Sequence, residues 1–93
     1  MEKINEQEFI SELNKNINNN IKVNINGSIV TTLQLTKITI NLRNDLIQIK
    51  GNEKDNFLEF NLNQVYKILF EKEKNILIIY IDDDIEIEII FLN

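Results

Sequence analysis

The chain has no cysteine, histidine, tryptophan or proline, and only two of its 93 residues are glycine. Without cysteine there are no disulfides and no thiolate chemistry. Without histidine the protein lacks the commonest metal ligand and the usual general base of enzymes. Gly27 and Gly51 stand alone, so neither belongs to a glycine-rich loop of the kind that holds phosphates. We therefore expect no enzymatic activity, no cofactor, and no catalytic or metal-ligating residues.

Basic residues are few. Ten Lys and Arg stand against 15 Asp and Glu, which gives a formal net charge of −5. Direct binding of nucleic acid depends on Lys and Arg that neutralise phosphates, so this balance argues against it. It argues equally against an anionic membrane surface. The partner that the charge favours is another protein with a basic surface.

Long hydrophobic runs are also missing. The longest wholly apolar run is Ile76–Ile81, far short of the ~20 residues that span a bilayer. The segment Met1 to Glu6 lacks the apolar stretch of a secretory signal. We expect a cytoplasmic protein with a single domain over residues 1–93, since domains are rarely much shorter than this.

The first segment predicts a short amphipathic helix. Asn5 is suited to the N-cap, and Glu8 stands three residues later, where a capping box places its carboxylate. One apolar stripe with helical spacing follows, made of Phe9, Ile10, Leu13 and Ile17. A helix this short is not stable alone, so it is expected to pack on the rest of the protein.

The remainder predicts strands that follow one another in hairpins. The first hairpin turns at Asn26-Gly27, the strongest short hairpin signal. A two-residue loop would place Ile25 opposite Ser28, and a three-residue loop would place it opposite Ile29. The second of these aligns the apolar face better, but both registers stay open.

The next hairpin has a single favoured register. A turn at residues 44–45 pairs Leu42 with Ile47 and Ile40 with Ile49. The turn residues and the alternation of apolar residues agree on this pairing.

Two segments lack a clean strand pattern. The apolar phase shifts between Leu35 and Ile38, so a bulge or a tight turn is expected at residues 36–37. Residues 63–71 fit a helix or a strand, and we favour the strand because they are mostly β-branched or aromatic. A short helical turn at residues 63–65 is compatible with this strand.

The last three strands predict two further hairpins. One sets Phe70 opposite Ile76, and the other, across the three aspartates, sets Tyr80 opposite Ile85. Five aromatic residues share faces with isoleucine and are expected in or near the core: Phe57, Phe60, Tyr66, Phe70 and Tyr80.

These elements predict an α+β fold, with one N-terminal helix packed on an antiparallel meander of about six or seven strands. The strands form a curved sheet or a partly open barrel. Sequential hairpins need no crossover connections. The apolar supply can exceed what one helix covers, because a single face is expected to hold Leu77, Ile79, Ile81, Ile90 and Leu92. That face is either an interface with a second copy or with another partner, or the core of a barrel.

The sharpest charge cluster lies near the C-terminus and supplies the predicted partner-binding residues. They are Asp82, Asp83, Asp84, Glu86 and Glu88. Their spacing does not match a calcium-binding EF-hand loop, so a hard-cation site is the less favoured interpretation. A solvated turn and strand face is the simplest one. The third interpretation places the carboxylates on a terminal edge strand. There they dock on a basic surface, or they prevent the edge from pairing with another strand.

The predicted function is that of a small acidic, non-catalytic protein-binding module, whose acidic strand edge or loop docks on a basic site. In size, charge and lack of catalytic groups it resembles small acidic domains that block nucleic-acid-binding proteins, as some phage anti-CRISPR inhibitors do. That resemblance implies an inhibitor that occludes the nucleic-acid-binding site of its target. The alternatives are a homo-oligomeric structural protein, and a domain that binds a small ligand in an apolar pocket between helix and sheet.

Overall fold

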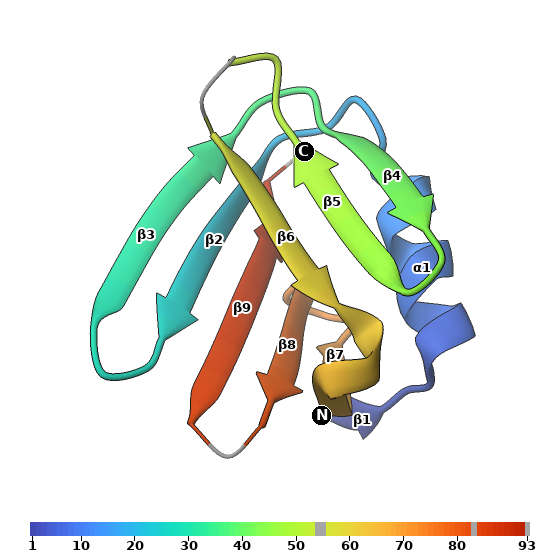
Figure 1. Cartoon of the computed structure of the whole chain (residues 1–93). Coiled ribbons are helices and arrows are strands. Elements are labelled where there is room, and N and C mark those ends of the chain that lie inside the picture. Colours follow the sequence, from blue (N-terminus) through green and yellow to red (C-terminus); the bar gives the residue numbers. More distant parts are fainter. Residues whose placement is uncertain (54–55, 83, 93) are drawn as a thin grey trace.

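The computed structural model of the chain describes residues 1–53, 56–82 and 84–92, which form one helix and nine strands in two antiparallel sheets (Figure 1). One sheet has six strands in the order β1-β7-β8-β9-β2-β3, and the other has three in the order β4-β5-β6. The strands are β1 (Glu2–Lys3), β2 (Ile21–Asn26), β3 (Val30–Leu35), β4 (Thr39–Arg43), β5 (Leu46–Lys50), β6 (Phe57–Asn61), β7 (Val65–Glu71), β8 (Ile76–Ile81) and β9 (Ile85–Phe91). The α+β class is confirmed, but the strands are more numerous than predicted.

The helix α1 (Glu6–Lys15) begins where the sequence predicts. The Asn5 side chain accepts a hydrogen bond from the backbone N–H of Glu8 at 2.8 Å. The Glu8 carboxylate accepts one from the backbone N–H of Asn5 at 3.1 Å. This capping box satisfies two donors that a helix start leaves unpaired, so it fixes the first turn of α1.

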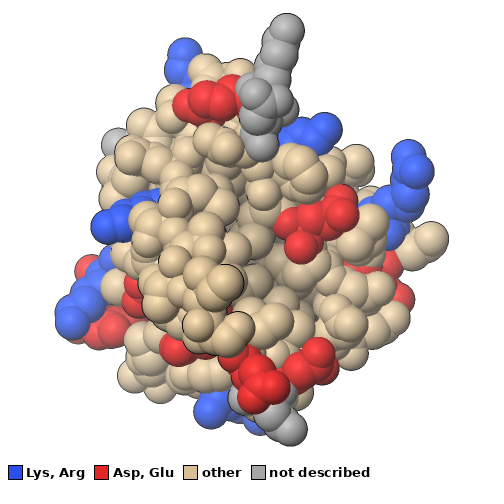
Figure 2. Space-filling view, turned by 60° about the vertical axis from the view of Figure 1, so that its left-hand side comes forward, with Lys and Arg blue, Asp and Glu red and all other residues tan. Residues whose placement is uncertain are grey.

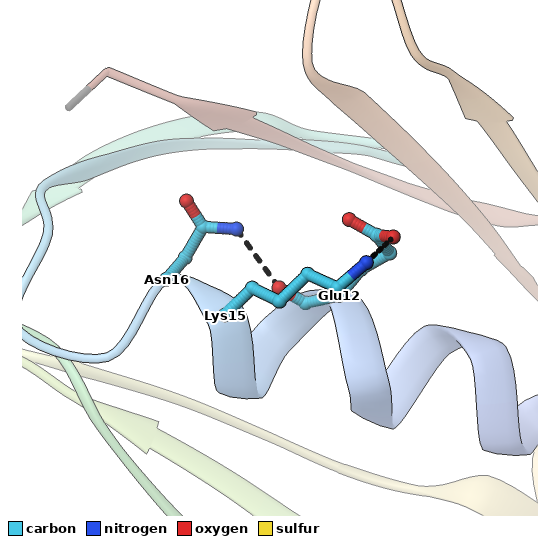
Figure 3. Close-up of polar contacts among 3 residues, drawn as sticks. All are labelled: Glu12, Lys15 and Asn16. Carbon is cyan, nitrogen blue, oxygen red and sulfur yellow. Dashed lines mark hydrogen bonds and ion pairs between the residues drawn. The ribbon is translucent and has the colours of Figure 1, made fainter.

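Asparagines end α1 two residues earlier than the apolar stripe suggests. The Asn16 amide donates to the carbonyl oxygen of Glu12 at 2.8 Å, and Lys15 forms an ion pair with the Glu12 side chain at 3.0 Å (Figure 3). Asn18 then adopts a left-handed φ of 71°. Ile17 therefore lies beyond the helix and is 41% exposed, so its place in the predicted stripe is wrong.

The core lies between the two sheets and α1, and among the described residues no buried side chain is polar or charged. Phe9 and Leu13 of α1 have no exposed surface. The Phe9 ring lies 6.2 Å from that of Phe60 on β6. These side chains pack α1 against the sheets.

The β4–β5 hairpin and the start of β7 follow the prediction. Leu42 pairs with Ile47 and Ile40 with Ile49. Asn44 has a left-handed φ of 56°, which asparagine tolerates better than most residues. Before β7 there is one 3-10 turn, η1 (Leu62–Gln64), in place of the longer helix that the sequence also allowed.

Both registers that the sequence left open for the β2–β3 hairpin are wrong. Ile25 lies opposite Thr31, and Ile21 lies opposite Leu35. Ile21 and Leu35 are both fully buried, so this register turns the apolar side chain of Leu35 into the core. Ile29 is left in the loop, 76% exposed.

The two C-terminal hairpins differ from the prediction by one residue. Phe70 pairs with Leu77, and Tyr80 pairs with Glu86. The turns set this register, since Asn75 and Asp82 both adopt left-handed φ angles, of 54° and 51°.

A one-residue shift exchanges the two faces of a strand. Leu77, Ile79 and Ile81 face the core and are buried. Ile90 pairs with Ile76, which places it on the opposite face from these three. The sequence predicted that Ile90 and Leu92 share one surplus apolar face with these three residues. That face is therefore not formed.

Leu13 and Ile17 allow a matched test of how α1 packs. We expect Leu13→Ala to lower the free energy of unfolding by about 2–5 kcal/mol, because it opens a cavity between helix and sheets. Ile17→Ala should lower it by about 1 kcal/mol or less, because this side chain is largely at the surface. Chemical denaturation followed by circular dichroism measures both values. Equal losses in the two variants would contradict the packing described here.

Candidate functional site

The acidic strand β9 lies inside the six-stranded sheet, so its predicted edge position is wrong. It pairs with β8 along one side and with β2 along the other (Figure 1). The reason is that β2 and β3 form a separate hairpin, which joins the sheet through the pairing of β2 with β9. The carboxylates of β9 therefore do not protect a free edge. Glu86 and Glu88 instead stand on the outer face of the sheet, opposite the core.

The five predicted acids lie in different surroundings. Asp82 and Asp84 are exposed in the turn between β8 and β9. Glu86 and Glu88 are half-buried on β9. Asp83 lies outside the described residues. On the side shown in Figure 2, several acidic side chains lie next to one another along the lower edge of the view, and others stand apart on uncharged surface.

Glu88 is part of a polar chain across three strands. The Asn24 amide of β2 donates to the Glu88 carboxylate at 2.7 Å. The Thr32 hydroxyl of β3 donates to the Asn24 side-chain oxygen at 2.9 Å. These bonds hold the Glu88 side chain against the sheet, so it is less free than the turn acids to meet a partner.

An open pocket of about 310 Å³ lies at the β8–β9 turn and includes two of the predicted acids. The β2–β3 loop lies beside the turn, since a Cβ atom added to Gly27 would stand 3.6 Å from the carbonyl oxygen of Asp84. We call it the tyrosine pocket, and its lining residues are Asn26, Gly27, Tyr66, Tyr80, Asp84, Ile85 and Glu86.

Two tyrosines form the apolar part of this pocket. The Tyr66 and Tyr80 rings lie 6.0 Å apart and are tilted by 44°. The ammonium nitrogen of Lys67 stands 4.7 Å from the centre of the Tyr80 ring. The pairing of β7 with β8 shifts between Val65 and Lys67, and Tyr66 occupies this irregularity. The bulge brings Tyr66 close to Tyr80 although the two are not direct cross-strand partners.

Sequence reasoning placed these tyrosines in or near the core. Tyr66 is 57% exposed, so that prediction is wrong for it, as it is for Phe57 at 49%. Phe60 and Phe70 are buried, as predicted. The sequence hardly separates the exposed aromatic residues from the buried ones, because β8 is apolar on both faces and does not show which of them is the inner one. The phenol hydroxyl, which favours contact with water, is the only hint that tyrosine belongs outside.

The surroundings of Tyr80 alter its acidity. Partial burial of the phenol, followed by the negative charge of the neighbouring Glu86 and the presence of Tyr66, raises the pKa of Tyr80 above its ordinary value. Tyr80 therefore stays neutral throughout the physiological pH range, so it offers an aromatic face and a hydroxyl rather than a negative charge.

The chemistry of the tyrosine pocket suits a cationic group. Aromatic faces and carboxylates both attract ammonium and guanidinium ions. Within residues 1–53, 56–82 and 84–92, no three acidic side chains lie close enough together to hold a metal ion. The same residues include no helix long and apolar enough to cross a membrane.

Comparisons with protein families, curated proteins and solved structures find no match to this chain. The interpretation of the tyrosine pocket therefore depends on its own geometry and charge.

The raised pKa of Tyr80 can be tested in a Tyr66→Phe background, in which Tyr80 is the only tyrosine of the chain. We expect ultraviolet absorbance to show that this phenol ionises above about pH 10, the ordinary value for tyrosine. Adding Glu86→Gln should lower the midpoint, because one cause of the shift is removed. Glu88→Gln is the matched control and should leave it unchanged.

The same shift predicts how stability depends on pH. The neutral phenol is favoured in the folded state, so the contribution of Tyr80 is fully present below about pH 10 and is lost as the pH rises through the folded pKa. The fall should be smaller in Glu86→Gln. If the midpoint were the same with and without Glu86, the stated effect of the Glu86 charge on the pKa of Tyr80 would be wrong.

Proposed function

We propose that the protein is a small acidic, non-catalytic protein-binding module, and that its tyrosine pocket receives a basic side chain from the surface of a partner protein. The observation that supports this most directly is the meeting of two tyrosine rings with two carboxylates in one open pocket. Asp84 and Glu86 come from the acidic segment that the sequence singled out, and the rings come from β7 and β8.

A guanidinium group is the favoured occupant. It is planar, stacks on aromatic rings and donates two parallel hydrogen bonds to a carboxylate. Lys67 already places a cation near the Tyr80 ring. An arginine of the partner would meet Tyr66, which is more exposed than Tyr80, together with the Asp84 carboxylate at the rim.

The charge of the whole chain supports the same proposal. A net charge of −5 attracts a basic surface over a distance, which speeds association more than it strengthens the final complex. Asp82 and Asp84 are exposed at the tip of the β8–β9 turn, where a partner would meet them early. Basic surfaces are common on nucleic-acid-binding proteins, so the proposed action is occlusion of such a site.

Capture from nuclease-treated cell lysate with the tagged protein is the first experiment. A specific protein that is retained at low salt and released at high salt is the expected result, because screening weakens contacts between exposed charges. The purified target should then lose nucleic-acid binding as this protein is added. Retention that does not change between low and high salt would contradict electrostatic docking.

Two turn residues provide matched charge variants for the complex. Asp84 and Glu73 are both exposed, and they lie in the turns at opposite ends of β8. We expect Asp84→Lys to weaken binding about tenfold at low salt, mainly by slowing association. Glu73→Lys makes the same change in net charge and should have little effect. Equal effects would mean that only net charge matters, and that the tyrosine pocket is not the site.

The aromatic contact has its own test. Tyr66→Ala should weaken binding by about 2- to 30-fold, the range that corresponds to a cation–π contact of about 0.5–2 kcal/mol. Tyr66→Phe keeps the ring and should bind like the unchanged protein. Calorimetry or surface plasmon resonance with the captured target measures both. A loss in Tyr66→Phe as large as in Tyr66→Ala would contradict a contact through the ring.

A further inference from the structure

No charged residue protects the edge strand β3, whose C-terminal end lies close to Gly51: a Cβ atom added there would stand 3.3 Å from the Cα atom of Leu35. The described residues form four edge strands, β1 and β3 in the larger sheet and β4 and β6 in the smaller one. β1 has two residues, β4 contains Arg43, and β6 contains Glu59. β3 has six residues, none of them charged.

Charge is missing around β3 as well as within it. Residues 23–36 include no Asp, Glu, Lys or Arg, and this is the longest uncharged run of a chain in which 27% of residues are charged. Ile29 and Val30, at the start of the strand, are 76% and 69% exposed. Soluble proteins usually protect an edge of this length with charges, proline, a bulge or a covering element, because unpaired N–H and C=O groups recruit other strands.

We infer that β3 pairs antiparallel with β3 of a second copy of this chain, across a two-fold axis perpendicular to the sheet. The charge distribution favours a second copy over other occupants. Two chains of net charge −5 repel each other wherever their acidic side chains come close. β3 contains no acidic side chain, so two copies that meet along β3 avoid this repulsion there. A basic partner gains nothing from an uncharged edge.

The side chains of β3 suit such self-pairing. With the axis perpendicular to the sheet, each residue faces one from the same side of the partner's strand. On the outer face, Thr32 and Gln34 of the two copies would meet, polar against polar. On the inner face, Leu33 and Leu35 would extend the apolar surface that faces the core. The two six-stranded sheets would then form one continuous sheet.

Sedimentation of the full chain over a range of concentrations tests this inference. The expected species has twice the monomer mass of 11.0 kDa, and added salt should not dissociate it. Thr32→Lys combined with Gln34→Lys should raise the dimer dissociation constant by about 100-fold, since like charges would then face each other across the pairing. Thr39→Lys combined with Asn41→Lys adds the same charge on the exposed edge strand β4 and should leave the dimer intact.

Hydrogen exchange keeps the test decisive even where a variant folds poorly. In the unchanged protein, backbone amides of β3 should exchange faster on dilution, and those of β4 should not. A monomer at every concentration would overturn the inference, as would a dimer that both lysine pairs leave intact. Asp84→Lys must not affect the dimer, so failure of the proposed partner binding and failure of self-pairing are distinguishable.

Discussion

The insertion of β9 between β8 and β2 holds the six-stranded sheet together. β7 and β8 form one hairpin and β2 and β3 another, and they share a sheet only because β9 pairs with both, from Ile21 opposite Phe91 to Asn26 opposite Glu86 along β2. This arrangement buries the inner faces of all three central strands in a core that has no polar side chain among the described residues. Any chemistry of the polar side chains therefore takes place at the surface. It also joins Asn24 to Glu88, brings the β2–β3 loop to the β8–β9 turn, and leaves β3 at the edge.

Local signals predicted local structure well. The capping box at Asn5 and Glu8 and the turn at Asn44 depend on side chains that bond or bend their own backbone, so neighbours in the sequence are enough to define them. The strand β8 is different. It is apolar on both faces, and a shift of one residue exchanges one apolar face for another without changing the pattern. Left-handed turn residues decide between them, and the sequence pattern alone did not show that Asp82 would be one.

The same shift explains which part of the candidate site the sequence predicts. The acids are visible because five of them fall within seven residues of the sequence, and Asp84 and Glu86 do line the tyrosine pocket. The sequence did not predict that Tyr66 and Tyr80 line the pocket, because their exposure depends on the β8 register and on an irregularity in β7. The sequence pattern also did not predict the position of β9, because the pairing of β9 with β2 joins strands that are far apart in the sequence. Glu88 illustrates the limit: its spacing matches Glu86, yet only the fold places Asn24 beside it.

The two proposed surfaces differ in physical character, and this difference limits how they can act together. The tyrosine pocket offers carboxylates and aromatic rings to a basic partner, while the β3 edge offers backbone groups and no charge. Pairing of β3 across an axis perpendicular to the sheet keeps the outer faces of both copies on one side. Glu86 stands on that face, so the two tyrosine pockets of a dimer would open toward the same side. A partner with two suitably spaced basic sites, or a basic surface that is itself repeated, would then be held by both, and the second contact would form at a high effective concentration. Self-pairing would thus strengthen electrostatic docking without adding any contact to the pocket itself.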